Sequence, residues 1–227
     1  MYRTIIVIFL VCMVSSVSAQ TVQRQNGTLH LTQQLSSNVT AASDLVGAIL
    51  GVTYADQTRE EFVWQDLGNN TGGVQNSRLS FSVTSIDVFT VPWTFTNLDQ
   101  DIVGFDLHTA PAQVVFDLDP GGTQGSGNGG RQFQLEVGTD LPFDSITATY
   151  SDILALTGSD PVGDLYATLA VQLSQPLQAN ESIVFSNDLD SSVSEIFAVP
   201  EPCGFPILFA MALPGLQRRK RTAKISV

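Results

Sequence analysis

RLSFSVTSIDV, residues 78–88, runs directly into FTVPWTFT, residues 89–96, and this stretch decides the fold class. Apolar and polar side chains alternate along both segments, which is the period-two pattern of a strand with one buried face. The alternation changes phase near Ser85, as a β-bulge would produce, and Pro92 favours an edge strand or a break. The stretch therefore predicts half-buried strands.

Further segments show the same pattern, and turns rich in Gly, Asn and Asp separate them. These strand candidates are residues 112–118, 131–137, 145–150, 165–173 and 182–185, with a shorter one at 28–31. Short helical turns are expected at residues 41–50, 58–65 and 151–156. We expect an all-β domain over residues 20–198, an antiparallel β-sandwich of jelly-roll or immunoglobulin-like type, with hydrophobic helices at the two termini.

Charge is distributed unevenly along the 227 residues. Between Gln20 and Val199 the chain has four arginines and no lysine, against 21 acidic residues. Such a surface repels nucleic acid and anionic lipid headgroups, so neither is expected as a direct partner. It attracts divalent cations loosely, as any dense carboxylate surface does.

The N-terminus has the three parts of a secretory signal peptide. Arg3 supplies the positive charge, residues 4–14 form an apolar run, and small residues precede a cleavage point between Ala19 and Gln20. An eleven-residue helix spans only about 17 Å, which is too short for a hydrocarbon core of about 30 Å. We therefore expect residues 1–19 to be removed and the mature chain to begin at Gln20.

The C-terminus carries a second apolar segment. The sequence VPEP at 199–202 precedes the apolar residues 203–216, and the basic cluster Arg218, Arg219, Lys220 and Arg221 follows. Basic residues beside an apolar segment stay on the cytoplasmic side of a membrane, which places the central domain outside. Fourteen residues interrupted by two prolines suit a transient membrane stop better than a permanent anchor.

This C-terminal pattern resembles the PEP-CTERM sorting signal of Gram-negative bacteria, also catalogued as the ice-binding protein C-terminal domain. The resemblance covers residues 199–224, and its motif matches Pro200, Glu201 and Pro202. It implies recognition by exosortase, a membrane-embedded processing enzyme, after a transient stay in the inner membrane. It also implies delivery to the cell envelope, the outer surface or the extracellular matrix. The resemblance carries no information about the domain between the two ends.

Paired aspartates are the only metal-binding pattern in the central domain. Asp117 and Asp119 would project from one side of a strand end, beside a glycine-rich loop at residues 121–130, and calcium binds such oxygen ligands. Two similar pairs occur at residues 99–101 and 188–190, and each of the three pairs also fits exposed turn residues. None continues as an EF-hand loop. Zinc is less expected, because the histidines His30 and His108 have no cysteine nearby.

No recognisable catalytic motif occurs in the central domain. Residues 125–130 match G-x-G-x-x-G, but a strand follows where a nucleotide site needs a helix. Trp64 and Trp93 are candidates for stacking on sugars, although the apolar strand around Trp93 favours burial. The leading hypothesis is a non-enzymatic structural or adhesive protein, with polysaccharide as a candidate partner. The alternatives are a secreted polysaccharide hydrolase, with dispersed acids such as Asp117 and Glu136, and a calcium-stabilised carbohydrate-binding module.

Overall fold

The computed structural model describes residues 20–35, 39–118 and 129–199. These residues form β-strands linked by loops and short 3-10 turns, so the all-β prediction is confirmed. Both predicted terminal helices fall in residues 1–19 and 200–227, which lie outside the described residues. Within the described ranges, no helix has the length and apolar character needed to cross a membrane.

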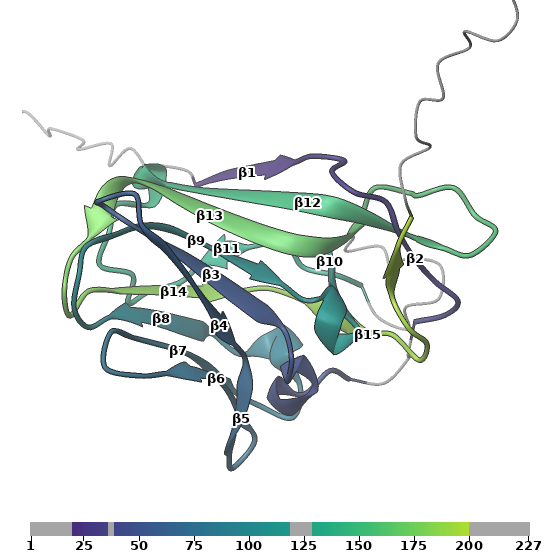
Figure 1. The fold of residues 1–227 in the computed structure, drawn as a ribbon, viewed down its shortest axis with the longest axis horizontal. Coiled ribbons are helices and arrows are strands. Elements are labelled where there is room, and N and C mark those ends of the chain that lie inside the picture. Colours follow the sequence, from purple (N-terminus) through teal and green to yellow (C-terminus); the bar gives the residue numbers. More distant parts are fainter. Residues whose placement is uncertain (1–19, 36–38, 119–128, 200–227) are drawn as a thin grey trace, which may run out of the picture.

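The larger sheet follows the order β16-β2-β12-β13-β9-β3-β4, and three further strands join it beside this path (Figure 1). Its strands are β1 (Thr21–Arg24), β2 (His30–Thr32), β3 (Ile49–Tyr54), β4 (Arg59–Val63), β9 (Ile102–His108), β10 (Val114–Asp117), β12 (Ile146–Leu156), β13 (Leu165–Leu177), β15 (Leu189–Ser191) and β16 (Phe197–Ala198). The long antiparallel pair of β12 and β13 forms its centre, and β13 also pairs with β9 and β10.

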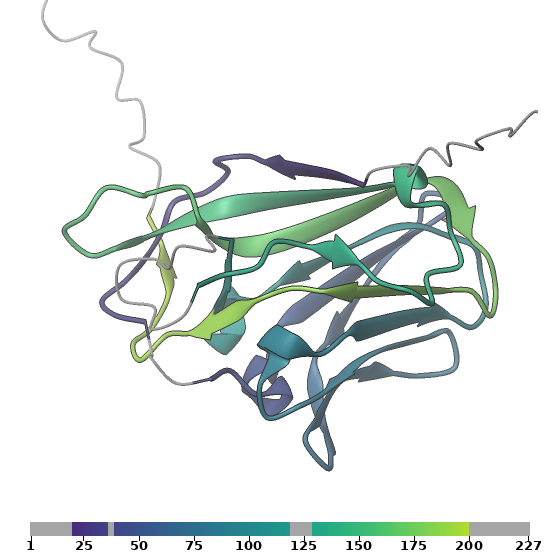
Figure 2. The same cartoon turned by 180° about the vertical axis from the view of Figure 1, so that it is seen from behind.

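The second sheet has the order β11-β14-β8-β7-β6-β5 and lies beneath the first, as the two opposite views in Figures 1 and 2 show. Its strands are β5 (Gln65–Gly68), β6 (Thr71–Gln75), β7 (Leu79–Thr84), β8 (Trp93–Asn97), β11 (Gln134–Leu135) and β14 (Ser182–Ser186). The 3-10 turns are η1 (Ala42–Leu45), η2 (Val88–Thr90), η3 (Ala110–Ala112) and η4 (Phe143–Ser145).

The core between the sheets is centred on Phe81 in β7. Its ring centroid lies within 6.0 Å of the centroids of five other rings, which belong to Trp64, Trp93, Phe95, Phe105 and Phe185. The apolar positions that alternate along β7 and β8 are the buried ones. Trp93 is 1% exposed, so its expected burial in the core is confirmed.

Residues 20–32, which we call the N-terminal strap, depart from the antiparallel expectation. Both of its strands, β1 and β2, pair in parallel with β12. Between them the strap passes Asp152, a residue within β12 that has a left-handed φ of 61°. The Gln20 side chain also bonds to the second sheet, donating to the Phe133 carbonyl at 2.6 Å and accepting from the Leu135 amide at 2.7 Å. The strap therefore covers one edge of β12 and bridges the two sheets.

Most of the expected helical turns are strands. Only Ala42–Leu45 forms a 3-10 turn, whereas residues 49–54 form β3, residues 59–63 form β4, and residues 151–156 complete β12. Pairing with distant strands outweighs weak local preference at these sites. Asp152 also has an irregular backbone conformation. The alternation of apolar and polar side chains that identifies a strand therefore stops before the end of β12.

The phase change near Ser85 has a different cause from the one expected. Strand β7 ends at Thr84, and the chain then leaves the sheet for η2, so the change marks the end of a strand and not a bulge. The break expected at Pro92 is present, because β8 begins at the next residue, Trp93.

Replacing Phe81 with alanine is expected to lower the free energy of unfolding by about 3–5 kcal/mol, because the cavity removes contacts to rings from both sheets. Urea denaturation followed by tryptophan fluorescence measures the change. Val137→Ala serves as the control, since Val137 is 97% exposed and its truncation is expected to change the free energy by less than about 0.5 kcal/mol. Equal midpoints for the two variants would contradict a core centred on Phe81.

Candidate metal centre

Asp117, Asp188 and Asp190 form a cluster of buried carboxylates. One oxygen from each lies within 4.8 Å of the oxygens of the other two. The residues are 0%, 5% and 8% exposed, in that order, whereas aspartate is almost never buried without a compensating group. We call these three residues the carboxylate cluster.

Strand pairing brings the cluster together from two distant parts of the chain. Strands β10 and β15 are antiparallel with Phe116 opposite Leu189, so Asp117 at the end of β10 lies next to Asp188. The Asp117 amide donates to the Asp188 carbonyl at 3.3 Å. Gly130 packs so closely on the Asp117 carboxyl that a Cβ there would overlap it. The local backbone is therefore shaped around this acidic side chain.

The cluster favours uptake of positive charge. Burial raises the pKa of Asp188 to about 8, and the neighbouring charges of Asp190, Asp117 and Asp87 act in the same direction. A hydrogen bond from the Leu189 amide opposes them only in part. Three carboxylates this close repel one another when ionised, so a bound proton or metal cation stabilises them.

A cavity of about 360 Å³ gives access to the cluster. Asp188 and Asp190 lie in its wall, together with Val39, Thr40, Asp87, Phe89, Gly129 and Leu189. The Arg131 guanidinium lies 4.8 Å from the centre of the Phe89 ring. The wall thus combines further oxygen atoms with one apolar ring, and it leaves room for an ion and its water.

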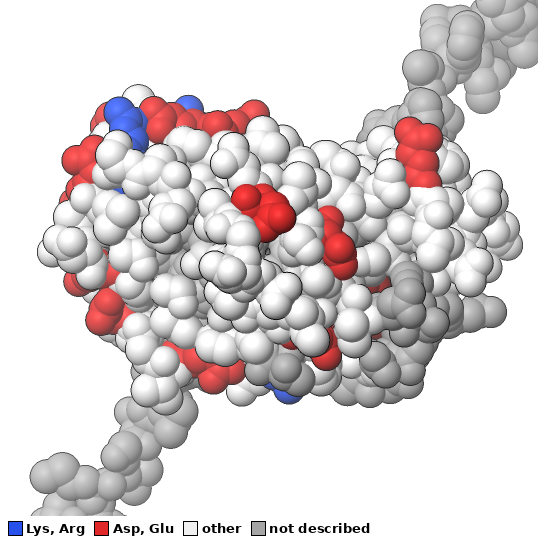
Figure 3. All heavy atoms as spheres, turned by 90° about the horizontal axis from the view of Figure 1, so that it is seen from below, with Lys and Arg blue, Asp and Glu red and all other residues white. Residues whose placement is uncertain are grey.

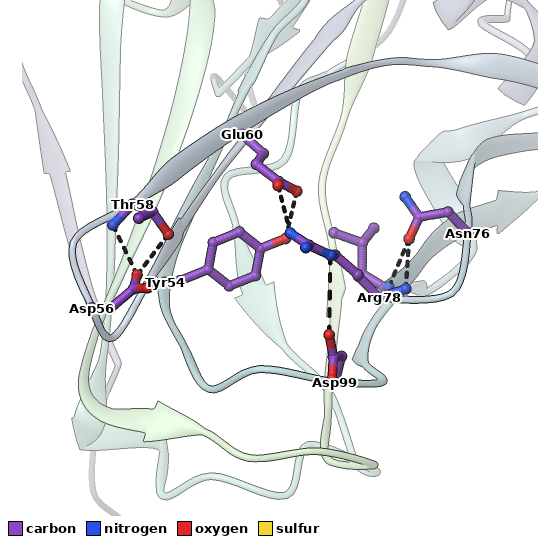
Figure 4. Close-up of polar contacts among 8 residues, drawn as sticks. Tyr54, Asp56, Thr58, Glu60, Asn76, Arg78 and Asp99 are labelled. Carbon is purple, nitrogen blue, oxygen red and sulfur yellow. Dashed lines mark hydrogen bonds and ion pairs between the residues drawn. The ribbon is translucent and has the colours of Figure 1, made fainter.

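The other arginines of the central domain are engaged away from the cluster. Arg78 pairs with Glu60 and lies 4.0 Å from Asp99, as Figure 4 shows, while Tyr54 donates to Glu60 at 3.2 Å. This network joins β3 and β4 of the larger sheet to the turn before β7.

Arg59 forms an ion pair with Asp106, and Arg24 donates to the Gly163 carbonyl at 3.3 Å. On the face shown in Figure 3, acidic side chains lie scattered over the surface and basic ones occur only near its edge. Three of the four arginines therefore form contacts away from the cluster, whereas Arg131 lies beside its cavity and its backbone bonds to Asp117 and Asp188.

The spacing of the cluster suits cation binding better than glycoside cleavage. Paired catalytic carboxyls lie about 5–5.5 Å apart in retaining glycosidases and about 6.5–9.5 Å apart in inverting ones, with room for a sugar between them. In the cluster, one oxygen from each carboxylate lies within 4.8 Å of the other two, and the three residues are at most 8% exposed, as expected for ligands that converge on one ion. Calcium takes about six to eight oxygen ligands, and three carboxylates beside a polar cavity supply a substantial part of that set.

The structure brings together residues from two aspartate pairs that lie far apart in the sequence. Asp117 meets Asp188 and Asp190, while Asp119 lies outside the described residues. Asp99 instead lies near Arg78, and Glu136 accepts a hydrogen bond from Ser186 at 2.8 Å without joining the cluster. The shared D-L-D sequence at residues 117–119 and 188–190 was the one available signal.

The predicted sorting residues cannot be placed in the same way. The Pro-Glu-Pro motif at 200–202 and the basic cluster at 218–221 lie outside the described residues, as does Ala19. Gln20, on the other side of the predicted cleavage point, begins the N-terminal strap.

Comparison with protein-family models, with curated proteins and with solved structures finds no match to this chain. Its function is therefore inferred from its own residues.

The raised pKa of Asp188 predicts a pH effect on the metal-free protein. Since the folded-state pKa, about 8, exceeds the ordinary value of 3.8, folding takes up a proton between these two pH values. The contribution of Asp188 to stability is therefore complete below about pH 4 and is lost as the pH rises to about 8, with a slope of at most about 1.4 kcal/mol per pH unit. Asp188→Asn cannot ionise and is expected to abolish this contribution.

Urea denaturation in the presence of a chelator, repeated between about pH 4 and pH 8, measures the difference between variant and wild type. Asp160→Asn provides the matched control, because Asp160 is exposed and lies outside the cluster. Parallel stability profiles for wild type and Asp188→Asn would rule out the raised pKa.

Proposed function

We propose that this chain is an exported structural or adhesive protein of the bacterial cell envelope or extracellular matrix. Its central domain, a β-sandwich of jelly-roll or immunoglobulin-like type in this proposal, acts without catalysis and contacts extracellular polysaccharide. The export machinery removes residues 1–19, and exosortase processes the tail that follows Val199. The protein is held in the inner membrane only until that step.

The observation that carries this proposal is the ordered C-terminal pattern of VPEP, an apolar segment and four basic residues. The boundaries of the folded domain support it. Gln20 is bonded to β11, and the Val199 amide donates to the Leu29 carbonyl at 2.8 Å. The described part of the chain is therefore held to its N-terminal strap at Val199, the residue directly before the motif.

Replacing Glu201 with alanine is expected to block processing, because the resemblance places this residue in the recognised motif. In a bacterium that has exosortase, the variant should accumulate with its tail in the inner-membrane fraction, while the wild type loses its tail and reaches the envelope or medium. Fractionation with mass spectrometry of the C-terminus measures this. Glu195→Ala, an exposed acid inside the domain, should be processed normally. Intact wild-type protein in the cytoplasm would overturn the proposal.

A calcium-stabilised carbohydrate-binding module is a second candidate, and the carboxylate cluster favours it. Carboxylate oxygens are the ligands that calcium prefers, and a single divalent ion would neutralise most of the cluster's charge. In this reading the ion ties β10 to β15 and shapes the adjoining cavity, which becomes the contact surface for a sugar chain. The same residues would serve binding and stability without a catalytic step.

Calcium is expected to raise the melting temperature of the full chain, and a chelator to reverse the rise, because the ion binds the folded state. Differential scanning calorimetry measures the shift, which should disappear in Asp190→Asn and persist in Asp160→Asn. If calcium leaves the wild-type transition unchanged, this second candidate fails. Cleavage of a polysaccharide that is lost in Asp188→Asn would instead favour the hydrolase.

A further inference from the structure

The two histidines of the chain lie side by side, although they are far apart in sequence. His30 belongs to β2 and His108 ends β9, and their ring centroids are 6.0 Å apart with an angle of 60° between the planes. His30 is 7% exposed and His108 is half-buried. The sequence contains two histidines in 227 residues, so their meeting on the larger sheet is a feature that composition alone did not suggest.

The hydrogen-bond partners fix which nitrogen of each ring carries a proton. His30 Nδ1 lies 3.3 Å from the Thr28 carbonyl, which only accepts, so this nitrogen donates. His108 Nδ1 lies 2.9 Å from the Thr168 hydroxyl, whose one proton is given to Asp152 at 2.6 Å. His108 Nδ1 must therefore donate as well. In both neutral rings the lone pair is then on Nε2, the nitrogen that can act as a metal ligand in this tautomer.

Both histidines are oriented through the same carboxylate. Asp152 accepts from the Thr168 hydroxyl on the His108 side, and it accepts from the Thr28 amide at 3.0 Å on the His30 side. This residue has a left-handed φ of 61°, and Gly27 packs against it so closely that a Cβ there would lie 2.6 Å from the Asp152 amide nitrogen. Backbone strain of this kind gathers at functional sites. Metal-binding histidines likewise donate their second nitrogen to a fixed acceptor.

We propose that His30 and His108 form a binding site for one divalent transition-metal ion of the Zn²⁺ or Ni²⁺ class. The two Nε2 atoms ligate the ion, and water completes its coordination. Imidazole nitrogen suits these metals, whereas the carboxylate cluster suits a hard cation such as calcium. Metal–nitrogen bonds of about 2.1 Å at a tetrahedral angle place two ligating ring centres roughly 5.3 Å apart, so the pair at 6.0 Å would close by less than about 1 Å on binding an ion.

Burial of the His108 ring, and not the charge around it, favours its neutral form. Burial lowers the pKa of His108, and the nearby His30 lowers it further, while the carboxylates of Asp152 and Asp106 and a hydrogen bond to the Ala167 carbonyl partly oppose the shift. The neutral ring is the form that binds a metal. The site lies beside β2, β9 and β13, whereas the carboxylate cluster lies on β10 and β15, so it is independent of the function proposed above.

Zinc titration calorimetry of the full chain tests the proposal, with excess calcium present to occupy surface carboxylates and the carboxylate cluster. We expect one zinc ion per chain, and at least a tenfold loss of affinity in His30→Gln and in His108→Gln. Glutamine retains a side-chain donor for the Thr28 carbonyl and the Thr168 hydroxyl. Asp190→Asn is the matched control and should bind zinc like the wild type. If zinc binds to the wild type but calcium does not raise its melting temperature, the calcium candidate fails and the histidine site stands. If calcium raises the melting temperature but zinc does not bind, the histidine site fails and the calcium candidate stands.

Thr168→Val tests the orientation network without removing a ligand. It should weaken zinc binding by about 10–100-fold, the usual effect of losing such a supporting contact. Histidine-selective NMR of the wild type provides a measurement that needs no variant to fold: zinc should shift both Nε2 resonances far more than the Nδ1 resonances. Unchanged Nε2 resonances, or equal zinc affinity in wild type and the histidine variants, would show that the pair only fastens the N-terminal strap.

Discussion

The ladder between β12 and β13 is the constraint on which the rest of the structure depends. It pairs residues 146–153 with residues 166–173 in continuous antiparallel register. On one side it carries the N-terminal strap, and on the other it carries β9 and β10. Asp117 is aligned opposite Leu165 and His108 opposite Thr168, so both candidate metal sites take their position from β13. Loss of register in this pair would displace every feature discussed here, because a one-residue slip moves each side chain to the opposite face.

The ligand atoms of the two candidate sites suit different classes of metal ion. The carboxylate cluster offers buried oxygen ligands whose mutual repulsion favours binding of a cation or a proton. The histidine pair offers nitrogen ligands that are held in one tautomer by neutral partners and one carboxylate. Hard and borderline metals therefore need not compete for the same place. With four arginines in the central domain, inorganic cations are a plain physical means of balancing its negative charge.

Sequence periodicity predicted the β class and the strands that face the core, because alternating burial is visible in a strand such as residues 79–84. It did not reveal the central strand β9, whose run of buried residues lacks a simple alternation. In the strap, the short strand expected at residues 28–31 corresponds to β2, but β1 was missed because it is short and mostly exposed, and the parallel pairing was not foreseen. All three residues of the carboxylate cluster belong to aspartate pairs that the sequence offered as candidates, but Asp188 and Asp190 lie more than 70 residues from Asp117 and meet it only through strand pairing. The histidine pair has the same origin.

The way the domain ends has a mechanical consequence for any form of the protein that stays tethered by its tail. Strand β16 has two residues, pairs antiparallel with β2 and with no other strand of the described residues, and is followed at once by the bond from Val199 to Leu29. Tension applied beyond Val199 would thus reach the body through β2 and the long edge of β12. The short terminal pairing would peel open first, one bond at a time, and the main ladder would stay intact. Under tension, this junction would extend by a few residues while the rest of the central domain keeps its fold.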